Sequence, residues 1–316
     1  MLKSADQTDV SLRHALMLAV TLVAATCYPA IKAGLVYAPP IRFAGLRTVI
    51  AGVVLLGILA ALKRPFWPTA AVRRWILPLG LAATTLTFGA MFLSPVHTGA
   101  GIASVLGNTQ PLAIIVLASV FMHEKLTRGK ILALCLGLAG VVVMALPVFG
   151  GENEHDTVGA MLALISSVGA GVASIMVKKL RPGPDLVALA GWQLVAGGLP
   201  LLALSQVFEP SRAIHWTASF AGILLFLALA GSALTTLIWF WALQKWDAGT
   251  LSLYLFVVPV FGIAIAVGIY GESIRFADVA GILLILIAMA VALFARSEGI
   301  EEKDKHSFAH NPEKRR

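Results

Sequence analysis

Apolar runs of about 20 residues dominate the sequence, and they restrict the folds open to this chain. Of its 316 residues, 59% are hydrophobic and 13% are charged, and the mean hydropathy is +0.88. Soluble domains carry about 25% charged residues, whereas an apolar run of about 20 residues can cross a bilayer as a helix. The sequence therefore predicts an all-α integral membrane protein.

We predict ten transmembrane helices joined by short connections. Helices satisfy their own backbone hydrogen bonds where no water is available. Residues 1–13 form a polar lead, and residues 296–316 form a charged tail that is expected to be disordered. The expected spans are 14–36, 41–62, 75–93, 98–122, 129–148, 158–178, 186–206, 219–244, 249–270 and 277–295.

Lysines and arginines are distributed unevenly between the two sides that ten spans define. One side holds both ends of the chain and 19 of the 24 basic residues, while the connection 149–157 on the other side has none. Cytoplasmic loops carry an excess of Lys and Arg, so both termini are expected in the cytoplasm. Membrane topology also explains the net charge of +8 better than nucleic-acid binding does.

The two halves of the chain repeat each other. An offset of 148 residues aligns Pro111 with Pro259, and near the start of each half an offset of 146 aligns Arg47 with Gln193. Internal repeats of this kind indicate a duplicated unit rather than two unrelated segments.

Each repeat contains five of the expected spans, in residues 14–148 and 158–295. Because five is odd, the two repeats must enter the membrane in opposite orientations. Inverted repeats with helices broken at matching positions are typical of secondary transporters, whose substrate sites lie between the halves. The sequence thus predicts two inverted five-helix repeats around a central cavity.

A polar run at 104–111 interrupts the fourth expected span. Asn108 and Gln110 bring amide groups into the apolar segment, and Pro111 removes the helical partner of the Gly107 carbonyl. One interpretation is a substrate site at a broken helix. The other is a kinked helix whose polar groups bond to neighbouring helices. Asn108 and Gln110 are two positions apart, so both can face one cavity only if the helix is distorted there.

Two basic residues, Lys32 and Arg47, fall inside apolar runs near the expected outer face. A charge within the bilayer costs several kcal/mol, so each needs a compensating contact. Either they snorkel to the outer interface or bond to other helices, or they contact a carboxylate of a substrate.

Further polar and aromatic side chains lie within the expected spans. Gln193 is the strongest of these candidates, because an amide in lipid needs several partners. Hydroxyl groups are weaker evidence because they often bond to the preceding turn of their own helix. The Trp239 region can line a cavity or pack against lipid. The predicted substrate-binding residues are Asn108, Gln110, Gln193, Thr85, Trp239, Tyr254, Lys32 and Arg47, with Pro111 and Pro259 as kink or gating positions.

The sequence lacks the motifs of enzyme chemistry. It contains no metalloprotease, nucleophile-elbow or phosphate-loop motif, and its acidic residues fall at loops, tails or helix ends. Cys27 and Cys135 both lie in apolar runs, which predicts neither a disulfide nor a metal site. We expect no cofactor and no catalytic residue.

Several motifs, taken in order, resemble the EamA-type branch of the drug/metabolite transporter superfamily. The resemblance covers nearly the whole chain and implies a ten-helix carrier of the bacterial inner membrane, often an exporter of amino acids or related metabolites. The motifs are Tyr28-Pro-Ala-Ile-Lys32, Phe43-Ala-Gly-Leu-Arg47, Pro111 followed by Glu124-Lys-Leu-Thr127, Leu237-Ile-Trp-Phe-Trp-Ala242, Pro259 and Gly271-Glu272.

The sequence therefore favours a secondary transporter in the lipid bilayer that exports a small-molecule substrate by alternating access. One alternative is a multidrug exporter for hydrophobic cations, which would need a buried carboxylate. An alternative from another class is a non-catalytic membrane sensor or structural protein, which the paired prolines of the repeat disfavour.

Overall fold

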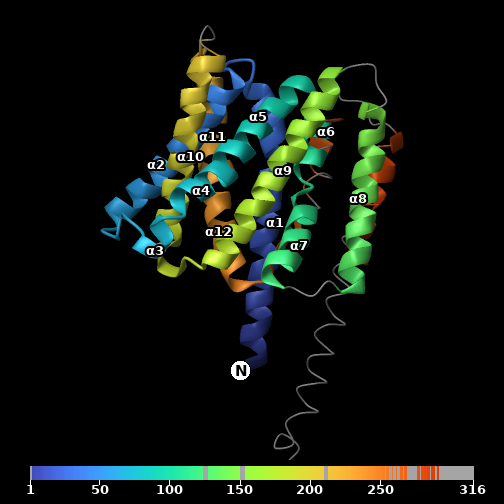
Figure 1. The fold of residues 1–316 in the computed structure, drawn as a ribbon, viewed down its shortest axis with the longest axis horizontal. Helices are drawn as coiled ribbons and strands as arrows, with labels where there is room; N and C mark the ends of the chain where they lie inside the picture. The colour runs from blue at the N-terminus through green and yellow to red at the C-terminus, as the bar shows by residue number, and fades with distance from the viewer. Residues whose placement is uncertain are drawn as a thin grey trace, which may run out of the picture.

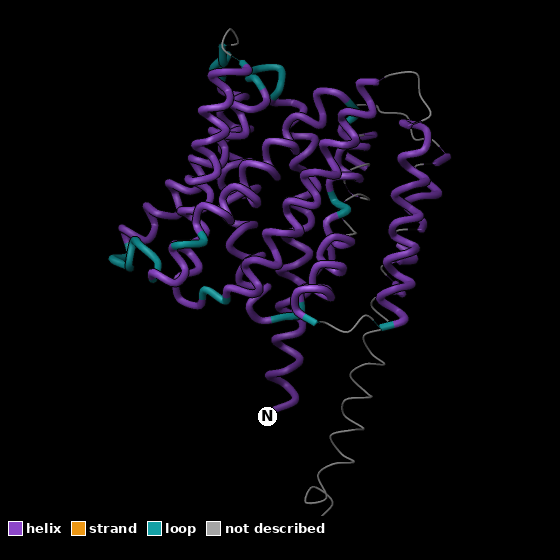
Figure 2. Tube along the Cα trace, viewed as in Figure 1, coloured by secondary structure: helices purple, strands orange, loops and turns teal. Residues whose placement is uncertain are grey.

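The computed structural model describes residues 2–123, 127–149, 154–209 and 213–252, together with scattered residues between 254 and 291. In this part of the chain all regular structure is helical (Figures 1 and 2). The predicted all-α class is therefore confirmed for the residues that the structure describes.

In the residues that the structure describes, the first half has eight α-helices and a π-helical segment, η1. The first helix begins at Leu2, so residues 2–13 of the expected polar lead form its first turns. The elements are α1 (Leu2–Gly34), α2 (Pro40–Ala61), α3 (Ala70–Arg73), α4 (Ile76–Gly80), η1 (Leu81–Leu86), α5 (Thr87–His97), α6 (Ala100–Gly107), α7 (Gln110–Met122) and α8 (Arg128–Phe149).

The second half has a similar order as far as the structure describes it, with a single helix where the first half has α3 and α4 and with a 3-10 helix before its second long helix. Its elements are α9 (Glu154–Leu180), the short 3-10 helix η2 (Gly183–Asp185), α10 (Leu186–Phe208), α11 (Ala218–Ala228), the π-helical segment η3 (Leu229–Leu234), α12 (Thr235–Lys245) and α13 (Ala248–Ser252).

Helices occupy each of the first eight expected spans, and six helices of the described chain are long and apolar enough to cross a membrane. The ninth and tenth expected spans are described only in part, and Pro259 lies outside the described residues. The number of ten therefore stays a prediction.

Local signals explain where α2 begins. Pro40 opens α2, a position at which its missing N–H costs nothing. The buried carboxylate of Glu209 accepts hydrogen bonds from the N–H groups of Ile41 (2.8 Å) and Arg42 (2.9 Å). This contact satisfies free donors and places a negative charge at the positive end of the α2 dipole.

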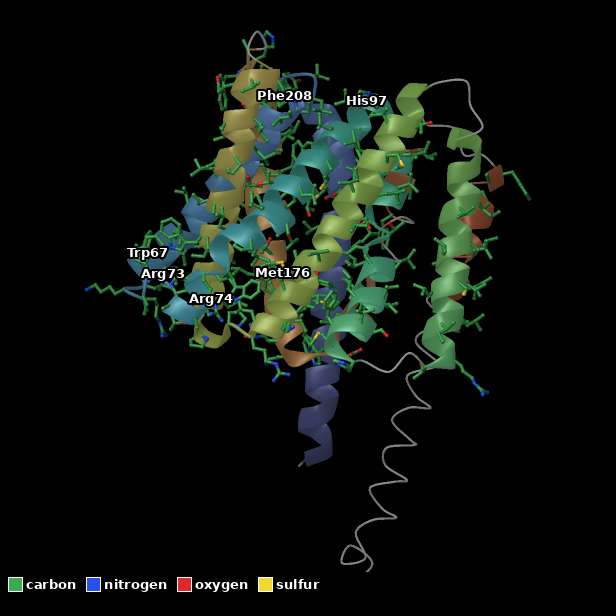
Figure 3. All side chains as sticks on the ribbon, in the orientation of Figure 1. Trp67, Arg73, Arg74, His97, Met176 and Phe208 are labelled. Atoms are coloured by element: carbon green, nitrogen blue, oxygen red, sulfur yellow. The ribbon has the colours of Figure 1, made fainter. Side chains whose placement is uncertain are left out.

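The N-terminus and the basic residues Arg73 and Arg74 lie at the same end of the bundle (Figures 1 and 3). Arg73, Arg74 and Trp67 lie toward that end, and His97 and Phe208 lie toward the opposite end (Figures 1 and 3). Helix α8 stands at one edge of the bundle, against α6, α7 and α9.

Helices α2 and α10, which occupy matching places in the two repeats, pack directly against each other at glycines. A Cβ added at Gly52 would lie 2.7 Å from Val195 Cγ2, and one added at Gly198 would lie 2.8 Å from Val49 Cγ2. The offset of 146 aligns Gly52 with Gly198 and Val49 with Val195, so the two contacts are equivalent in the two repeats. The contacts of Gly45 with Leu202 and of Gly191 with Leu56 are related in the same way. The order of the contacts shows that α2 and α10 run antiparallel.

The two π-helical segments also occupy matching places. Leu81–Leu86 and Leu229–Leu234 have the same length and are 148 positions apart, and each leads into an 11-residue helix. Such segments are rare and are often found at functional sites. The two repeats therefore share an irregular backbone feature as well as sequence similarity.

We predict that Gly52→Ala destabilises the protein and that Gly57→Ala does not. The new Cβ at Gly52 would lie 2.6 Å from the Gly191 carbonyl oxygen, whereas Gly57, on the same helix, has no atom within 4 Å of the corresponding position. Overpacking of this kind costs about 1–3 kcal/mol. The measurement is thermal unfolding of both purified variants in detergent, and equal melting temperatures would contradict the predicted contact.

Candidate functional site

A cavity of about 190 Å³ lies among helices contributed by both repeats. Its lining comes from α1, α2, η1, α5, the α6–α7 junction, α9, α10, η3 and α12, together with Leu255. Five residues predicted from sequence meet here: Asn108, Gln110, Gln193, Trp239 and Arg47.

The break in the fourth expected span brings two of these residues to the cavity. Helix α6 ends at Gly107 and α7 begins at Gln110, with Pro111 in the first turn of α7. Asn108 and Gln110 both line the cavity because the backbone between them is not helical. The helix is interrupted at the polar run, and this interruption allows both side chains to face one cavity.

Ser174 on α9 joins two of the predicted residues. Its hydroxyl accepts hydrogen bonds from Gln110 Nε2 (3.2 Å) and Trp239 Nε1 (3.0 Å), and it donates to the Ala170 carbonyl (2.8 Å). The contact fixes the indole of Trp239 at the cavity wall, with 9% of the residue exposed. Asn108 instead donates to the Ser104 carbonyl of its own chain segment at 2.6 Å.

Arg47 is buried on α2 and bonds across the interface to η3. Its Nε donates to the Leu227 carbonyl (3.0 Å) and Ser232 Oγ (2.7 Å), and its Nη2 donates to the Gly231 carbonyl (2.7 Å). The guanidinium carbon also lies 4.7 Å from the centre of the Phe88 ring. With 1% of Arg47 exposed, the interpretation that it snorkels to the membrane surface is wrong, and bonding between helices is what the structure shows.

Gln193 makes the matching contact from the other repeat. Its Oε1 accepts a hydrogen bond of 2.8 Å from Thr84 Oγ1, which belongs to η1. The offset of 146 aligns Arg47 with Gln193, and the offset of 148 aligns Thr84 with Ser232. Each repeat thus extends a polar side chain to the π-helical segment of the other repeat, and both side chains border the cavity.

The remaining predicted residues lie elsewhere. Thr85 donates to the Gly197 carbonyl at 2.7 Å and is not part of the cavity lining. Tyr254 is buried in the main apolar cluster, and Lys32 lies half-buried in the last turn of α1. Neither lines this cavity.

Sequence reasoning missed the contributions of α1 and α9. Tyr28 lines the cavity and packs so closely on Gly107 that a side chain there would collide with its hydroxyl. Ser166, Ala170 and Ser174 line it from α9 at spacings of four residues. That spacing is visible in the sequence, beside a second stripe of small residues on the same helix, formed by Gly159, Ala163, Ser167 and Gly171.

The stripe next to it serves close packing, as its small residues predict. A Cβ added at Gly171 would lie 2.7 Å from Ala113 Cβ, and Ser167 shares a 2.7 Å hydrogen bond with Thr109. One face of α9 thus holds the α6–α7 junction while the adjacent face borders the cavity.

The described lining of the cavity carries a positive charge and no negative charge. Arg47 is the only charged side chain among the described lining residues, and no carboxylate accompanies it there. Within the described residues, no group of three His, Cys, Asp or Glu side chains is placed to hold a metal ion. The arrangement offers hydrogen-bond donors, hydroxyl groups and aromatic surface for binding.

Comparison with known proteins places this architecture in a family. A model of the EamA-like transporter family matches residues 12–146 and again residues 157–294. The chain belongs to the EamA-like transporter family. It is a multi-pass membrane transporter and not an enzyme, and the double match indicates duplicated halves.

Relatives and a solved structure are similar along nearly their full lengths. The uncharacterized transporter YvbV of Bacillus subtilis is 30% identical over 305 residues, covering 92% of this chain and 97% of that protein. A probable amino-acid metabolite efflux pump of Salmonella typhimurium is 28% identical over 293 residues, covering 88% and 94%. A solved crystal structure with 20% identity has the same fold, with a TM-score of 0.71 and coverage of 91% and 98%.

We predict that Asn108→Ala and Gln110→Ala lower substrate affinity and transport severalfold with little loss of stability. Each substitution removes one hydrogen bond: that of Asn108 is local, and that of Gln110 joins two helices, for which the average in membranes is about 0.6 kcal/mol. Affinity and thermal unfolding would be measured on the same preparations. Thr85→Val is the matched control, since it removes a hydrogen bond outside the cavity. If affinity is unchanged in both cavity variants, the two amides serve helix packing alone.

Proposed function

We propose that this EamA-like transporter exports amino acids or related small metabolites across the bacterial inner membrane by alternating access. The observation that supports this most directly is a cavity bordered by both repeats, with π-helical segments at matching positions in its wall. The likeness to a probable amino-acid metabolite efflux pump favours the same substrate class.

The proposed architecture has ten spans in two inverted repeats. Antiparallel packing of α2 on α10, with contacts that exchange under the repeat offset, supports the inversion. A cavity between inverted repeats can open to either side of the membrane when one repeat rocks against the other. The irregular turns in η1 and η3 are places where such a movement needs little rearrangement of regular helix.

The proposed orientation places both termini in the cytoplasm. Arg73 and Arg74 lie toward the same end of the bundle as the N-terminus (Figures 1 and 3). Basic residues concentrate on the cytoplasmic side of membrane proteins, so this end is assigned to the cytoplasm.

The cavity chemistry argues against the alternative of a multidrug exporter for hydrophobic cations. Such a substrate would be repelled by Arg47, and no carboxylate among the described lining residues offsets that charge. Like charges brought together at low dielectric cost several kcal/mol. A neutral, zwitterionic or anionic substrate fits the cavity better.

We predict that cells producing the protein release amino acids when these accumulate inside. The measurement is mass spectrometry of the medium after loading cells with dipeptides, with cells lacking the protein for comparison. Ala170→Phe, which fills the cavity wall on α9, should abolish the release. Val168→Phe on the same helix points away from the core with 53% exposure and should leave the release intact.

The same assay distinguishes the alternatives. Efflux of the cation ethidium without any change in amino acids would support the multidrug exporter. No change in any small molecule, with both variants equal to the wild type, would favour a sensor or structural protein.

A further inference from the structure

We propose that Arg47 binds a carboxylate of the substrate and thereby sets the substrate class of the cavity. The class is small carboxylic acids with an apolar substituent, including apolar amino acids. This inference rests on the proposed transport function and specifies the chemistry of the same cavity.

One edge of the Arg47 guanidinium donates hydrogen bonds to the protein, and Nη1 on the other edge has no acceptor among the described residues. Nε donates to the Leu227 carbonyl at the end of α11 and to Ser232 Oγ of η3. Nη2 donates to the Gly231 carbonyl of η3 and to Cys27 Sγ (3.8 Å). Nη1 is buried and has no hydrogen-bond partner among the described residues. Two N–H donors therefore stay unused on a charged group that borders the cavity.

The contacts of Arg47 do not neutralise its charge. Carbonyl oxygens, a hydroxyl and the ring faces of Phe88 (4.7 Å) and Phe92 (5.5 Å) stabilise the cation partially. A buried charge is normally paired with an opposite charge, and the described cavity lining supplies none. A carboxylate on the substrate would supply both the missing charge and the missing acceptor.

The matching position in the second repeat contacts its π-helical segment with a neutral side chain. Gln193 makes the equivalent contact to η1 through Thr84 with a neutral amide. The same fold thus builds one inter-repeat contact with an amide and the other with a guanidinium. The positive charge of Arg47 is best explained by what the cavity binds.

The rest of the cavity limits the size and polarity of the substrate. Phe88, Met91, Trp239 and Phe240 offer apolar surface in a space of about 190 Å³. Hydroxyl and amide groups at the wall can accept hydrogen bonds from an ammonium group, but no described carboxylate pairs with one. The carboxylate is therefore the group that the site requires, and the amino group is optional.

The first experiment compares matched acids and amides on the wild-type protein. Isothermal titration of the purified full-length protein in detergent would use L-phenylalanine, 3-phenylpropionate and L-phenylalaninamide, with the corresponding leucine set. We expect acids of at least one set to bind with or without the amino group. We expect the amides to bind at least about tenfold more weakly, equivalent to about 1.4 kcal/mol. Equal binding of acids and amides, or binding of none of the acids, overturns the proposal.

Variants on the same helix assign the preference to Arg47. Arg47→Gln introduces the residue of the matching position and should remove the preference for acids, while Arg47→Lys should retain part of it. Arg42→Gln is the control, since Arg42 donates to the Glu209 carbonyl at 3.1 Å and does not line the cavity. An acid preference that survives Arg47→Gln overturns the assignment. Should that variant not fold, the wild-type comparison still decides the substrate class.

The efflux assay separates this proposal from the function it rests on. If amino acids are released but acids and amides bind equally, the transport function stands and the role of Arg47 falls. If no metabolite is released, the transport function fails independently of any binding preference.

Discussion

Backbone hydrogen bonding in lipid is the constraint on which this structure depends. A helix in hydrocarbon must satisfy its own N–H and C=O groups, so it can be irregular only where protein covers it. Within the described part of the expected spans, irregular backbone occurs at η1, at η3 and between α6 and α7, and these places border the cavity. At η3 the carbonyl of Gly231 accepts from both Arg47 and Thr235. Irregular backbone and polar side chains therefore depend on each other at this site.

Close packing of α2 on α10 makes those contacts possible. Glycines at matching positions bring the two backbones together, so the side chains of Arg47 and Gln193 reach across to the opposite repeat. A larger residue at Gly52 would separate the helices and lengthen both contacts. The same packing that stabilises the bundle thus also positions the polar groups of the cavity.

The sequence predicted features that follow from hydrophobicity and repetition. Helices fill the first eight expected spans, and the break before Pro111 falls where its missing N–H predicts it. The π-helical segments were not predictable, because they contain no proline and read as continuous apolar helix. The sequence predicts Thr85 as a binding residue, whereas in the structure Thr84 bonds to Gln193 and Thr85 bonds to the Gly197 carbonyl. Tyr28 and Ser174 were missed because packing between distant helices places them at the cavity.

Arg47 is charged and the matching Gln193 is neutral, so a nearly symmetric fold can favour one orientation of a bound substrate. Two related repeats offer equivalent walls to a substrate, yet an amino acid or other carboxylate is not symmetric. A charge on one wall alone fixes which end of the molecule lies there. It also makes the empty cavity costly to close, because excluding water around an unpaired guanidinium leaves its charge without compensation. On the proposed assignment, a bound carboxylate removes that cost, so closure around substrate is favoured over closure around an empty site.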